Sequence, residues 1–462
     1  NFTFTDLFFQ QGLGDINRQG ESFGRSRSGD GRRVQVEFVS ANPTGPLTVG
    51  HGRGAVYGDT VARLLEWTGH QVEREYYFND AGRQMRILGD SVRLRYLELL
   101  GQPVTFPEDY YQGEYIKDIA RHLLERHGDS LKDEPATGRF KEQAEQEIFE
   151  DIKATLKSLG IVHDSFYNEH SLYETGKIER VIDALRERGL VYEKDKALWF
   201  RASALGNEKD KVIVKSSGEP TYRLPDIAYH REKFARGFDL MIDVFGADHV
   251  ATYPDVLAAL RALDYDAARV KVLIHQFVTI TQNGEVVKMS TRKANFITLD
   301  ELIEDVGPDV VRYFFLMRTA TSHLNFDLDL ARKQSDENPV FYLQYAHARI
   351  ASILRYAETS GMELKAGEAE LSLLATQAEL DLIKLLLTFP ETVESCALTY
   401  EPHRLAEYLH QVAGLFHRFY HECRVVTDDA RLSLSRLALC NATRITMRNG
   451  LTILGVAAPD AM

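Results

Sequence analysis

The sequence predicts an α/β domain built on a parallel sheet and interrupted by a helical insertion, followed by an all-α domain. Residues 34–38 alternate apolar and polar like a strand and lead through a turn into the apolar, helix-compatible run 55–67. Charged amphipathic helix covers the region around 115–160. Further strand-like runs follow at 197–201, 212–215 and 240–245. Beyond Asn338 only helical spacing of apolar residues remains, so we expect a separate all-α domain there.

Changes in sequence character divide the chain into three parts. Residues 1–33 open on alternating apolar residues, as if inside a strand, and end in a polar, glycine-rich stretch. We interpret them as the remnant of an additional N-terminal domain with its linker, and the missing initiator methionine as a sign of truncation. Residues 34–334 form the predicted α/β domain, with the insertion at roughly 90–195. Residues 335–462 form the predicted helical domain.

The composition is typical of a soluble protein with several hydrophobic cores, because 44% of the 462 residues are hydrophobic and 27% are charged. No apolar run approaches the roughly 20 residues that cross a bilayer, and the start lacks a signal-peptide pattern. Three cysteines without C-x-x-C spacing favour a reducing compartment, so we expect a cytoplasmic location. The net charge of −13 does not exclude a nucleic-acid partner, since basic patches can lie within an acidic total.

The segment Ser40–Gly54 carries the strongest sign of chemistry. A strand delivers the chain to a turn, and Gly50 and Gly52 would let the backbone approach a ligand without a Cβ in the way. The N-terminus of the following helix would offer N–H groups to phosphate, and His51 would stabilise charge as pyrophosphate leaves. The alternative is a glycine-rich loop whose histidine caps a helix.

A second, basic segment follows a predicted hairpin. The strand candidate 270–281 meets Val286 and Val287 across Asn283-Gly284, a pair that tolerates positive φ. The next residues are Lys288, Met289, Ser290, Thr291, Arg292 and Lys293. Their cations could fold over a triphosphate, and the alternative is a solvated basic loop.

Together the two segments resemble the HIGH and KMSKS motifs of class I aminoacyl-tRNA synthetases, and the residues around them are similar to the arginyl-tRNA synthetase family of bacterial type. The similarity extends over nearly the whole chain, in the order of the family. The sequence segments that carry the similarity are Ser40–Pro46, Asn79–Gly82, Tyr111–Tyr115, Asp226–His230, Gly246–His249, Asn338–Tyr342 and Gln344–Arg349. As a set these segments are highly specific for the family, although no single segment would be.

The resemblance implies a Rossmann-like catalytic domain and a helical anticodon-binding domain in an arginine–tRNA ligase. ATP and L-arginine would form arginyl-adenylate, and the arginyl group would then pass to the terminal ribose of tRNA(Arg). Magnesium would accompany ATP, and the enzyme would be a monomer. In the helical domain, Tyr345 and Arg349 would contact anticodon bases, although both could instead pack in a helix interface.

Six positions match the amino-acid contacts of the family, namely Glu37, Ser40, Asn42, Asp80, Tyr222 and Asp226. A guanidinium is planar and permanently charged, so a specific pocket needs carboxylates and a flat or hydroxyl-bearing wall. We expect Asp226 to face the guanidinium, Tyr222 to line it, and Asn42 to hold the α-amino or carboxylate end. Without the family match, Asp226 could be a helix N-cap and Asp80 a turn residue.

The resemblance assigns catalytic roles to His51, Lys288, Arg292 and Lys293. The matching ATP-binding positions are Pro46, Thr48, Gly50, His51, Gly52, Gly246, Asp248, His249, Lys288, Met289 and Ser290. His249 would close over ATP from a strand end, and a buried, satisfied histidine is the alternative. The chain departs from the family at Thr48, where a hydroxyl replaces an imidazole. It departs again at Thr291, where a lysine is expected and Arg292 or Lys293 would replace it.

Two other functions fit parts of the sequence. A nucleotidylyltransferase could use the same Thr-x-Gly-His loop on a small substrate, but it would not need the helical domain after residue 335. A non-catalytic, synthetase-like binding protein would be expected to lose phosphate-directed side chains, whereas His51, Lys288 and Ser290 are present.

Overall fold

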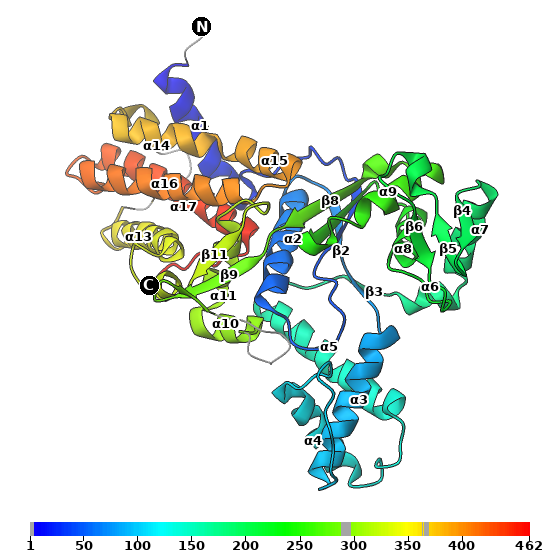
Figure 1. Ribbon diagram of the computed structural model, residues 1–462. Coiled ribbons are helices and arrows are strands. Elements are labelled where there is room, and N and C mark those ends of the chain that lie inside the picture. Colours follow the sequence, from blue (N-terminus) through cyan, green and yellow to red (C-terminus); the bar gives the residue numbers. More distant parts are fainter. Residues whose placement is uncertain (1–3, 288–296, 363, 365–368) are drawn as a thin grey trace.

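The computed structural model describes residues 4–287, 297–362, 364 and 369–462, and Figure 1 shows how its elements are arranged. The helices are α1 (Asp6–Gln19), α2 (Val49–Trp67), α3 (Gly82–Leu99), α4 (Glu114–His127), α5 (Lys141–Ser158), α6 (His170–Glu174), α7 (Lys177–Glu187), α8 (Arg223–Ala235), α9 (Tyr253–Ala262), α10 (Leu299–Val306), α11 (Pro308–Leu316), α12 (Leu328–Ala331), α13 (Pro339–Thr359), α14 (Gln377–Leu387), α15 (Phe389–Thr399), α16 (His403–Glu422) and α17 (Ala430–Leu454). The strands are β1 (Arg33–Glu37), β2 (Gln71–Phe78), β3 (Ser165–Asn168), β4 (Val191–Lys194), β5 (Ala197–Phe200), β6 (Lys211–Val214), β7 (Leu240–Gly246), β8 (Val270–His275), β9 (Val278–Gln282), β10 (Glu285–Val286) and β11 (Leu324–Asp327).

Five parallel strands form the central sheet in the order β3-β2-β1-β7-β8, which confirms the predicted parallel α/β domain. Ile242 and Val244 of β7 belong to one hydrophobic core together with α2, whereas Met241 belongs to a second core with α8 and α9. The chain builds one half of the sheet outward from β1 and the other half outward from β7. The strand order therefore reverses between β1 and β7, which is where open α/β sheets bind ligands.

The predicted strand 270–281 consists of two strands in different sheets, which corrects that prediction. β8 completes the parallel sheet, whereas β9 pairs with β10 and β11. The break falls at Gln276, whose backbone oxygen accepts a hydrogen bond of 2.8 Å from Arg53. The predicted hairpin turn is confirmed, because Asn283 and Gly284 have positive φ values of 53° and 76°.

The helices α3, α4 and α5 pack on one another and project from the sheet as a separate lobe (Figure 1). The structure corrects the end of the range of roughly 90–195 predicted for this insertion. β3 lies inside that range and pairs in parallel with β2, so the chain has already returned to the central sheet at Ser165. A second small lobe follows, in which β4, β5 and β6 form an antiparallel sheet.

Helices α13 to α17 form the all-α part of the chain, and α1 packs against α14 and α17. The strand-like start lies largely outside the described residues, and the chain is helical from Asp6 onward. Leu13 and Ile16 of α1 are fully buried, and Asn17 donates a hydrogen bond of 3.0 Å to the backbone oxygen of Ala438. The helix within the predicted N-terminal remnant is therefore packed as an element of the helical domain.

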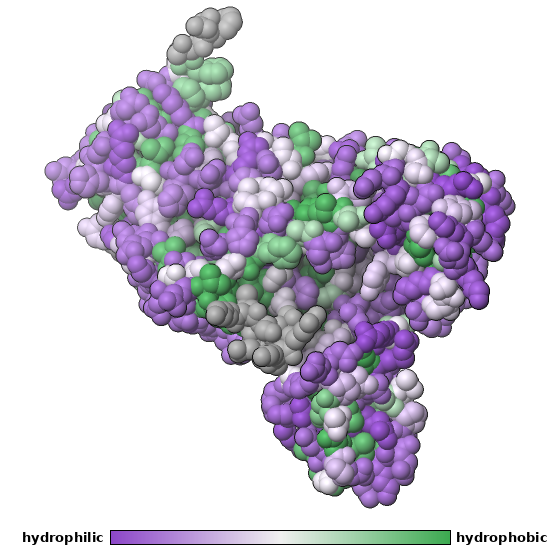
Figure 2. Space-filling model, in the orientation of Figure 1, coloured by the Kyte–Doolittle hydropathy of each residue, from purple (hydrophilic) through white to green (hydrophobic). Residues whose placement is uncertain are grey.

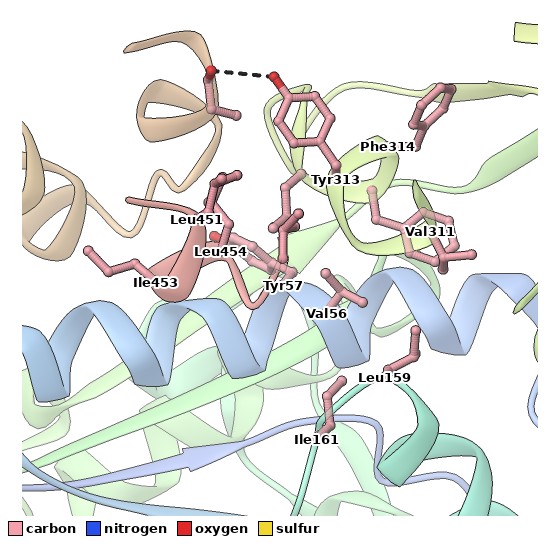
Figure 3. Packing of buried hydrophobic residues seen from close by; sticks show 14 of the residues in the cluster. Val56, Tyr57, Leu159, Ile161, Val311, Tyr313, Phe314, Leu451, Ile453 and Leu454 are labelled. Atoms are coloured by element: carbon pink, nitrogen blue, oxygen red, sulfur yellow. Dashed lines mark hydrogen bonds between the residues drawn. The ribbon is translucent and has the colours of Figure 1, made fainter. Parts of the chain in front are cut away.

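The side chain of Arg312 joins three parts of the molecule. Its buried guanidinium donates to Asp59 Oδ2 of α2 at 2.7 Å, to the Leu159 oxygen after α5 at 2.9 Å, and to the Leu454 oxygen at the end of α17 at 2.9 Å. A Cβ at Gly455 would lie 2.3 Å from the guanidinium carbon, so only glycine fits there. Figure 3 shows the buried apolar side chains at this junction, including Val56, Ile161, Val311, Phe314, Leu451 and Ile453.

The face of the molecule shown in Figure 2 is mostly hydrophilic, and its apolar side chains lie in separate patches. In the ranges given above, no helix is long and apolar enough to cross a membrane.

Candidate active site

A cavity of about 780 Å³ opens at the carboxyl ends of β1, β7 and β8, beside the first turns of α2 and α8. It lies at the point where the strand order reverses, which is the expected place for a ligand. Residues in its wall include Glu37, Ser40, Asn42, Thr48, Gly50, His51, Glu169, Tyr222, Asp226, Gly246, Asp248, His249 and His275.

Helix α2 begins at Val49 rather than at Ala55, where the predicted run began. Thr48 is its N-cap. The Thr48 Oγ1 accepts from the His51 backbone N–H at 3.4 Å, and His51 Nδ1 accepts from the Thr48 backbone N–H at 3.2 Å. This reciprocal cap stabilises a first turn whose glycines have low helix propensity. The alternative in which His51 caps a helix is therefore confirmed, and the same side chain also lines the cavity.

The cap fixes the chemistry of the His51 ring. Because Nδ1 accepts a hydrogen bond, the neutral ring carries its proton on Nε2. Burial lowers the pKa of His51, against the opposing charge of Asp248, so the ring is neutral near pH 7. Burial also lowers the pKa of the neighbouring His275, to about 4. The helix N-terminus thus has a neutral N–H donor beside its backbone N–H groups, a combination that suits an anion.

The glycines of this segment allow close packing as well as access. A Cβ at Gly52 would lie 2.5 Å from a methyl carbon of Leu299, and a Cβ at Gly54 would lie 2.7 Å from the ring of His275. The prediction that Gly52 lets the backbone approach a ligand is therefore corrected, since its open side faces the core. Neither Gly52 nor Pro46 is in the described cavity wall, whereas Gly50 is.

After β1 the backbone passes through two residues with positive φ, Val39 at 71° and Ser40 at 44°. Such values are costly for a β-branched residue, and strain of this kind concentrates at functional sites. Ser40 Oγ holds the turn, because it donates to Glu37 Oε1 at 2.9 Å and accepts from the Tyr77 N–H at 3.2 Å. The turn brings Ser40 and Asn42 into the cavity wall.

Glu37 belongs to a buried ion network at the sheet end of the cavity. Lys233 of α8 donates to Glu37 Oε2 and to Asp243 Oδ1, both at 2.6 Å. His230 has Nε2 2.8 Å from Asp243 Oδ2 and Nδ1 2.8 Å from the Asp226 backbone oxygen, so both ring nitrogens face an acceptor. Burial lowers the pKa of Lys233, but the charges of Asp243 and Glu37 outweigh burial and raise it. Glu37 and Asp243 thus share a buried lysine, and His230 also contacts Asp243.

Asp226 lies in the same cavity without such a match. In the described part of the chain, no lysine or arginine nitrogen lies within 4.0 Å of its carboxylate. Burial raises the pKa of Asp226 to about 7, with His230 opposing this shift and the charges of Glu37 and Glu169 adding to it. A cationic ligand would relieve this cost.

Glu169, which follows β3, is the second carboxylate without a cation. It accepts hydrogen bonds from the Tyr77 hydroxyl at 2.7 Å, the Asn79 amide at 2.8 Å and the Tyr173 hydroxyl at 3.2 Å, all neutral donors. Burial raises the pKa of Glu169 as well. Asp226 and Glu169 are therefore two carboxylates at the sheet end of the cavity that no lysine or arginine of the described residues pairs with.

The other predicted arginine-binding residues differ in whether they line the cavity. Tyr222 occupies the N-cap position of α8 and is 74% exposed at the cavity. Asp226 lies a turn further on, and in the described ranges its carboxylate caps no backbone N–H, so the N-cap alternative is wrong. Asn42 lines the cavity, where its amide donates to Gln84 at 2.8 Å. Asp80 accepts from Asn168 at 2.8 Å and lies outside the described wall, which fits the turn alternative.

At the other end of the cavity, Gly246 ends β7, and Asp248 and His249 follow it. The ring of His249 stacks on Phe245 with centroids 5.2 Å apart, and more than half of the His249 side chain is exposed. The alternative of a buried, satisfied histidine is therefore wrong. This flat, accessible surface suits the base or ribose of a nucleotide.

The predicted residues Lys288, Met289, Ser290, Arg292 and Lys293, and with them Thr291, lie outside the described residues. The chain is described again from Ile297, and its next residue, Thr298, forms an antiparallel bridge with Thr48. Leu299 donates a hydrogen bond of 2.8 Å to the Leu47 oxygen. The residues after the basic segment are thus attached to the N-terminus of α2, beside His51.

Comparison with known proteins agrees with this geometry. A family model described as the catalytic domain of class I tRNA synthetases (R) matches residues 16–309, and one described as the DALR anticodon binding domain matches residues 343–462. The chain belongs to the class I arginyl-tRNA synthetase family. Arginine–tRNA ligases from Desulfotalea psychrophila and Chlorobaculum parvum are 56% and 54% identical to it, over 100% of this chain and 84% and 85% of their own lengths.

Solved structures of arginyl-tRNA synthetases share the fold. A structure described as an arginyl-tRNA synthetase from Campylobacter jejuni has a TM-score of 0.91 at 31% identity, and the match covers 99% of this chain and 100% of that one. The Thermus thermophilus arginyl-tRNA synthetase has a TM-score of 0.78 at 24% identity, over 100% of this chain and 87% of that one, which shows a likeness of fold.

In the part of this synthetase that matches the DALR domain, aromatic side chains gather between α13 and α16. Tyr345 stacks on Phe341 and His417, with centroids 6.2 Å and 6.4 Å apart, and is 37% exposed. The Arg349 guanidinium lies over the rings of Tyr345 and Tyr420 at 5.2 Å and 5.6 Å. Tyr345 and Arg349 therefore pack within a helix interface, as the alternative predicted, and still leave a surface for a partner.

Several residues of the synthetase site were missed from the sequence. They are Tyr77, Glu169, Lys233, Asp243 and His275. They belong to no motif, and the one available signal was their position: Glu169 and His275 stand at carboxyl ends of parallel strands. Lys233 and Asp243 read as ordinary helix and strand residues, because only the fold brings their charges to Glu37.

Proposed function

We propose that this chain is an arginine–tRNA ligase, which activates L-arginine with ATP and transfers the arginyl group to the 3′-terminal ribose of tRNA(Arg). The observation that carries this proposal is the content of one cavity, in a chain that is 56% identical to an arginine–tRNA ligase. At one end the cavity has a helix N-terminus with a neutral imidazole, and at the other it has two carboxylates without a cation. The first feature suits the phosphates of a nucleoside triphosphate, and the second suits a guanidinium.

In the first step the arginine carboxylate attacks the α-phosphate of ATP and pyrophosphate leaves. His51 donates from Nε2 to a phosphate oxygen as negative charge develops, and the backbone N–H groups at the N-terminus of α2 act on the same charge. The Thr48 oxygen accepts from the His51 backbone N–H and also lies 3.2 Å from His51 Nδ1, so the Thr48 hydroxyl proton can donate to Nδ1 or turn to a phosphate oxygen. Lys288, with Arg292 or Lys293, neutralises the triphosphate. This catalysis consists of positioning and charge stabilisation.

The arginine lies with its guanidinium toward Asp226 and its α-amino and carboxylate groups toward Ser40 and Asn42. Tyr222 covers it from the rim of the cavity. Both oxygens of Glu37 already accept hydrogen bonds, one from Ser40 and one from Lys233. Glu37 therefore acts by orienting Ser40 and by pairing with Lys233. In this orientation the reacting carboxylate lies nearest to the turn that leads into α2.

ATP is bound as its magnesium complex. Magnesium would neutralise part of the phosphate charge, and among the described residues no group of three or more His, Cys, Asp or Glu could hold a metal ion. The aromatic surface with Tyr345 and Arg349 stacks on splayed anticodon bases. We further propose that the enzyme acts as a monomer in the cytoplasm. The helical domain disfavours a nucleotidylyltransferase, which would not need it.

ATP–pyrophosphate exchange with each amino acid, with and without tRNA, tests the activity. Of the amino acids tested, only arginine should support exchange. Exchange with lysine or another amino acid but never with arginine would refute the proposed specificity.

Replacing His51 with alanine removes the N–H donor and half of the α2 cap, and leaves the carboxylates untouched. We expect arginyl-adenylate formation to fall by about 10²- to 10³-fold, the usual effect of losing one such donor. Arginine binding, measured by calorimetry, should survive in this variant. Normal turnover would remove His51 from the mechanism.

A further inference from the structure

Tyr115 joins the α3–α5 lobe to the turn that leads into α2. It stands in the first turn of α4, and its hydroxyl donates a hydrogen bond of 2.8 Å to the backbone oxygen of Thr44. Thr44 lines the cavity. Within the described ranges no other donor reaches the Thr44 oxygen. The segments Tyr111–Tyr115 and Ser40–Pro46, both of which resemble the family, therefore meet at one hydrogen bond.

Two glycines leave room for the Tyr115 ring. A Cβ at Gly113, the N-cap of α4, would lie 2.4 Å from the ring. A Cβ at Gly45 would lie 2.9 Å from the Tyr115 hydroxyl oxygen and 3.1 Å from Cζ. The φ of Gly45 is not in the left-handed region, so its backbone conformation does not itself require glycine. The ring of Tyr115 is what excludes a side chain at Gly45.

A second tyrosine holds the other half of the same turn. Tyr76 of β2 donates a hydrogen bond of 2.7 Å to the backbone oxygen of Ala41, which lies between the two residues proposed to hold the arginine α-amino and carboxylate groups. The central sheet thus fixes the arginine half of the turn. The half that leads to His51 is fixed by Tyr115, from a different lobe.

We propose that Tyr115 is a positioning residue, which fixes the turn before α2 and so sets where His51 and the N-terminal N–H groups of α2 meet the phosphates. This inference rests on the proposed function, because it concerns the activation of arginine with ATP. Tyr115 is not in the described cavity wall, so it acts through Thr44 and not on the ligand itself. A displacement of about 1 Å in such a site lowers a rate by about 100-fold.

The test is arginine-dependent ATP–pyrophosphate exchange by the full chain at varied ATP concentration. In Tyr115→Phe, kcat/KM for ATP should fall about 10- to 100-fold, because the Thr44 oxygen loses its donor. The Kd for arginine, measured by calorimetry, should stay within about threefold, because Tyr76 still holds the arginine half of the turn.

Tyr96→Phe is the matched control. The Tyr96 hydroxyl donates to the Gly128 oxygen inside the same lobe, away from the turn, so this variant should keep kcat/KM for ATP within about threefold. Equal losses of kcat/KM in the Tyr115 and Tyr96 variants would reduce Tyr115 to a structural role and overturn the proposal. A loss of arginine affinity as large as the loss of kcat/KM for ATP would overturn it as well.

A second variant tests the same contact even if Tyr115→Phe folds poorly. Gly45→Ala keeps the hydroxyl but places a Cβ against it, so it should also lower kcat/KM for ATP. The two losses should not multiply: Gly45→Ala combined with Tyr115→Phe should stay within about threefold of Tyr115→Phe alone. Losses that multiply would contradict a shared contact. An unmodified chain without arginine-dependent exchange would refute the proposed function and this role with it, whereas an active chain with unaffected variants would refute the role alone.

Discussion

Among the five carboxylates in the cavity wall, two pairs at the sheet end differ in what balances their charge. Glu37 and Asp243 share Lys233, at 2.6 Å from each, and Asp243 also binds His230. Among the described residues, no lysine or arginine nitrogen lies within 4.0 Å of the carboxylate of Asp226 or Glu169, and burial raises the pKa of both. Burial alone therefore does not distinguish a structural acid from a ligand-binding one. In the proposed function, the fold supplies the opposite charge for Glu37 and Asp243, and the substrate supplies it for Asp226.

The largest effect expected from this comparison is on stability. Replacing Lys233 with methionine leaves Glu37 and Asp243 buried without their shared cation, and removing one partner of a buried ion pair typically costs about 3–5 kcal/mol. We expect a loss of that size in the free energy of unfolding, measured by urea denaturation. Lys177→Met is the control, because its 2.6 Å pair with Glu232 is partly exposed and such pairs contribute at most about 1 kcal/mol. Equal losses in both variants would remove the distinction between the pairs.

Asp226→Asn should have the opposite pattern, a loss of binding without a loss of stability. The KM for arginine should rise about 10- to 100-fold, because a hydrogen bond between charged groups is lost. The free energy of unfolding at pH 8 should rise by about 0.5–2 kcal/mol, since the variant relieves an unbalanced buried charge. Kinetics and urea denaturation of the same preparation measure both. A less stable variant would show that Asp226 is already balanced within the fold.

The smallest effect is a pH dependence of arginine binding. The pKa of Asp226 is about 7 in the free enzyme, and a bound guanidinium favours the ionised carboxylate and lowers that pKa. Binding below pH 7 must therefore expel a proton, so the KM for arginine should rise about tenfold per pH unit as the pH falls from 7 toward 5. Asp226→Asn should flatten this profile. A profile with the same slope in that variant would assign the titration to another group.

Much of the fold followed from patterns within single segments. The strands β1, β5, β6 and β7 and the turn at Asn283 were predicted because alternation and turn chemistry are local. The start of α2 was misplaced because three glycines hide a helix that the Thr48 cap and contacts with Leu299 and His275 stabilise. The break after β8 was missed because Arg53, far away in sequence, binds the backbone there.

The site was predictable to the extent that its residues stand in motifs. His51, Asn42 and Asp226 were predicted because they stand in sequence segments that match the family, and they lie in one cavity. Glu169 was not found, because a glutamate after a strand is common and its meaning depends on which cations the fold brings near it. Charge balance is a property of the whole structure, so no segment of sequence could reveal it.

The contacts of Arg312 have a mechanical consequence. One guanidinium holds the helix that carries His51, the end of the α3–α5 lobe and the last helix of the anticodon-binding part at distances of 2.7–2.9 Å. A hydrogen bond does not stretch far, so none of these three bodies can rotate by more than a small angle without displacing the others or breaking the link. A displacement of the end of α17 or of the α3–α5 lobe would therefore be transmitted through Arg312 to α2, the helix that carries His51.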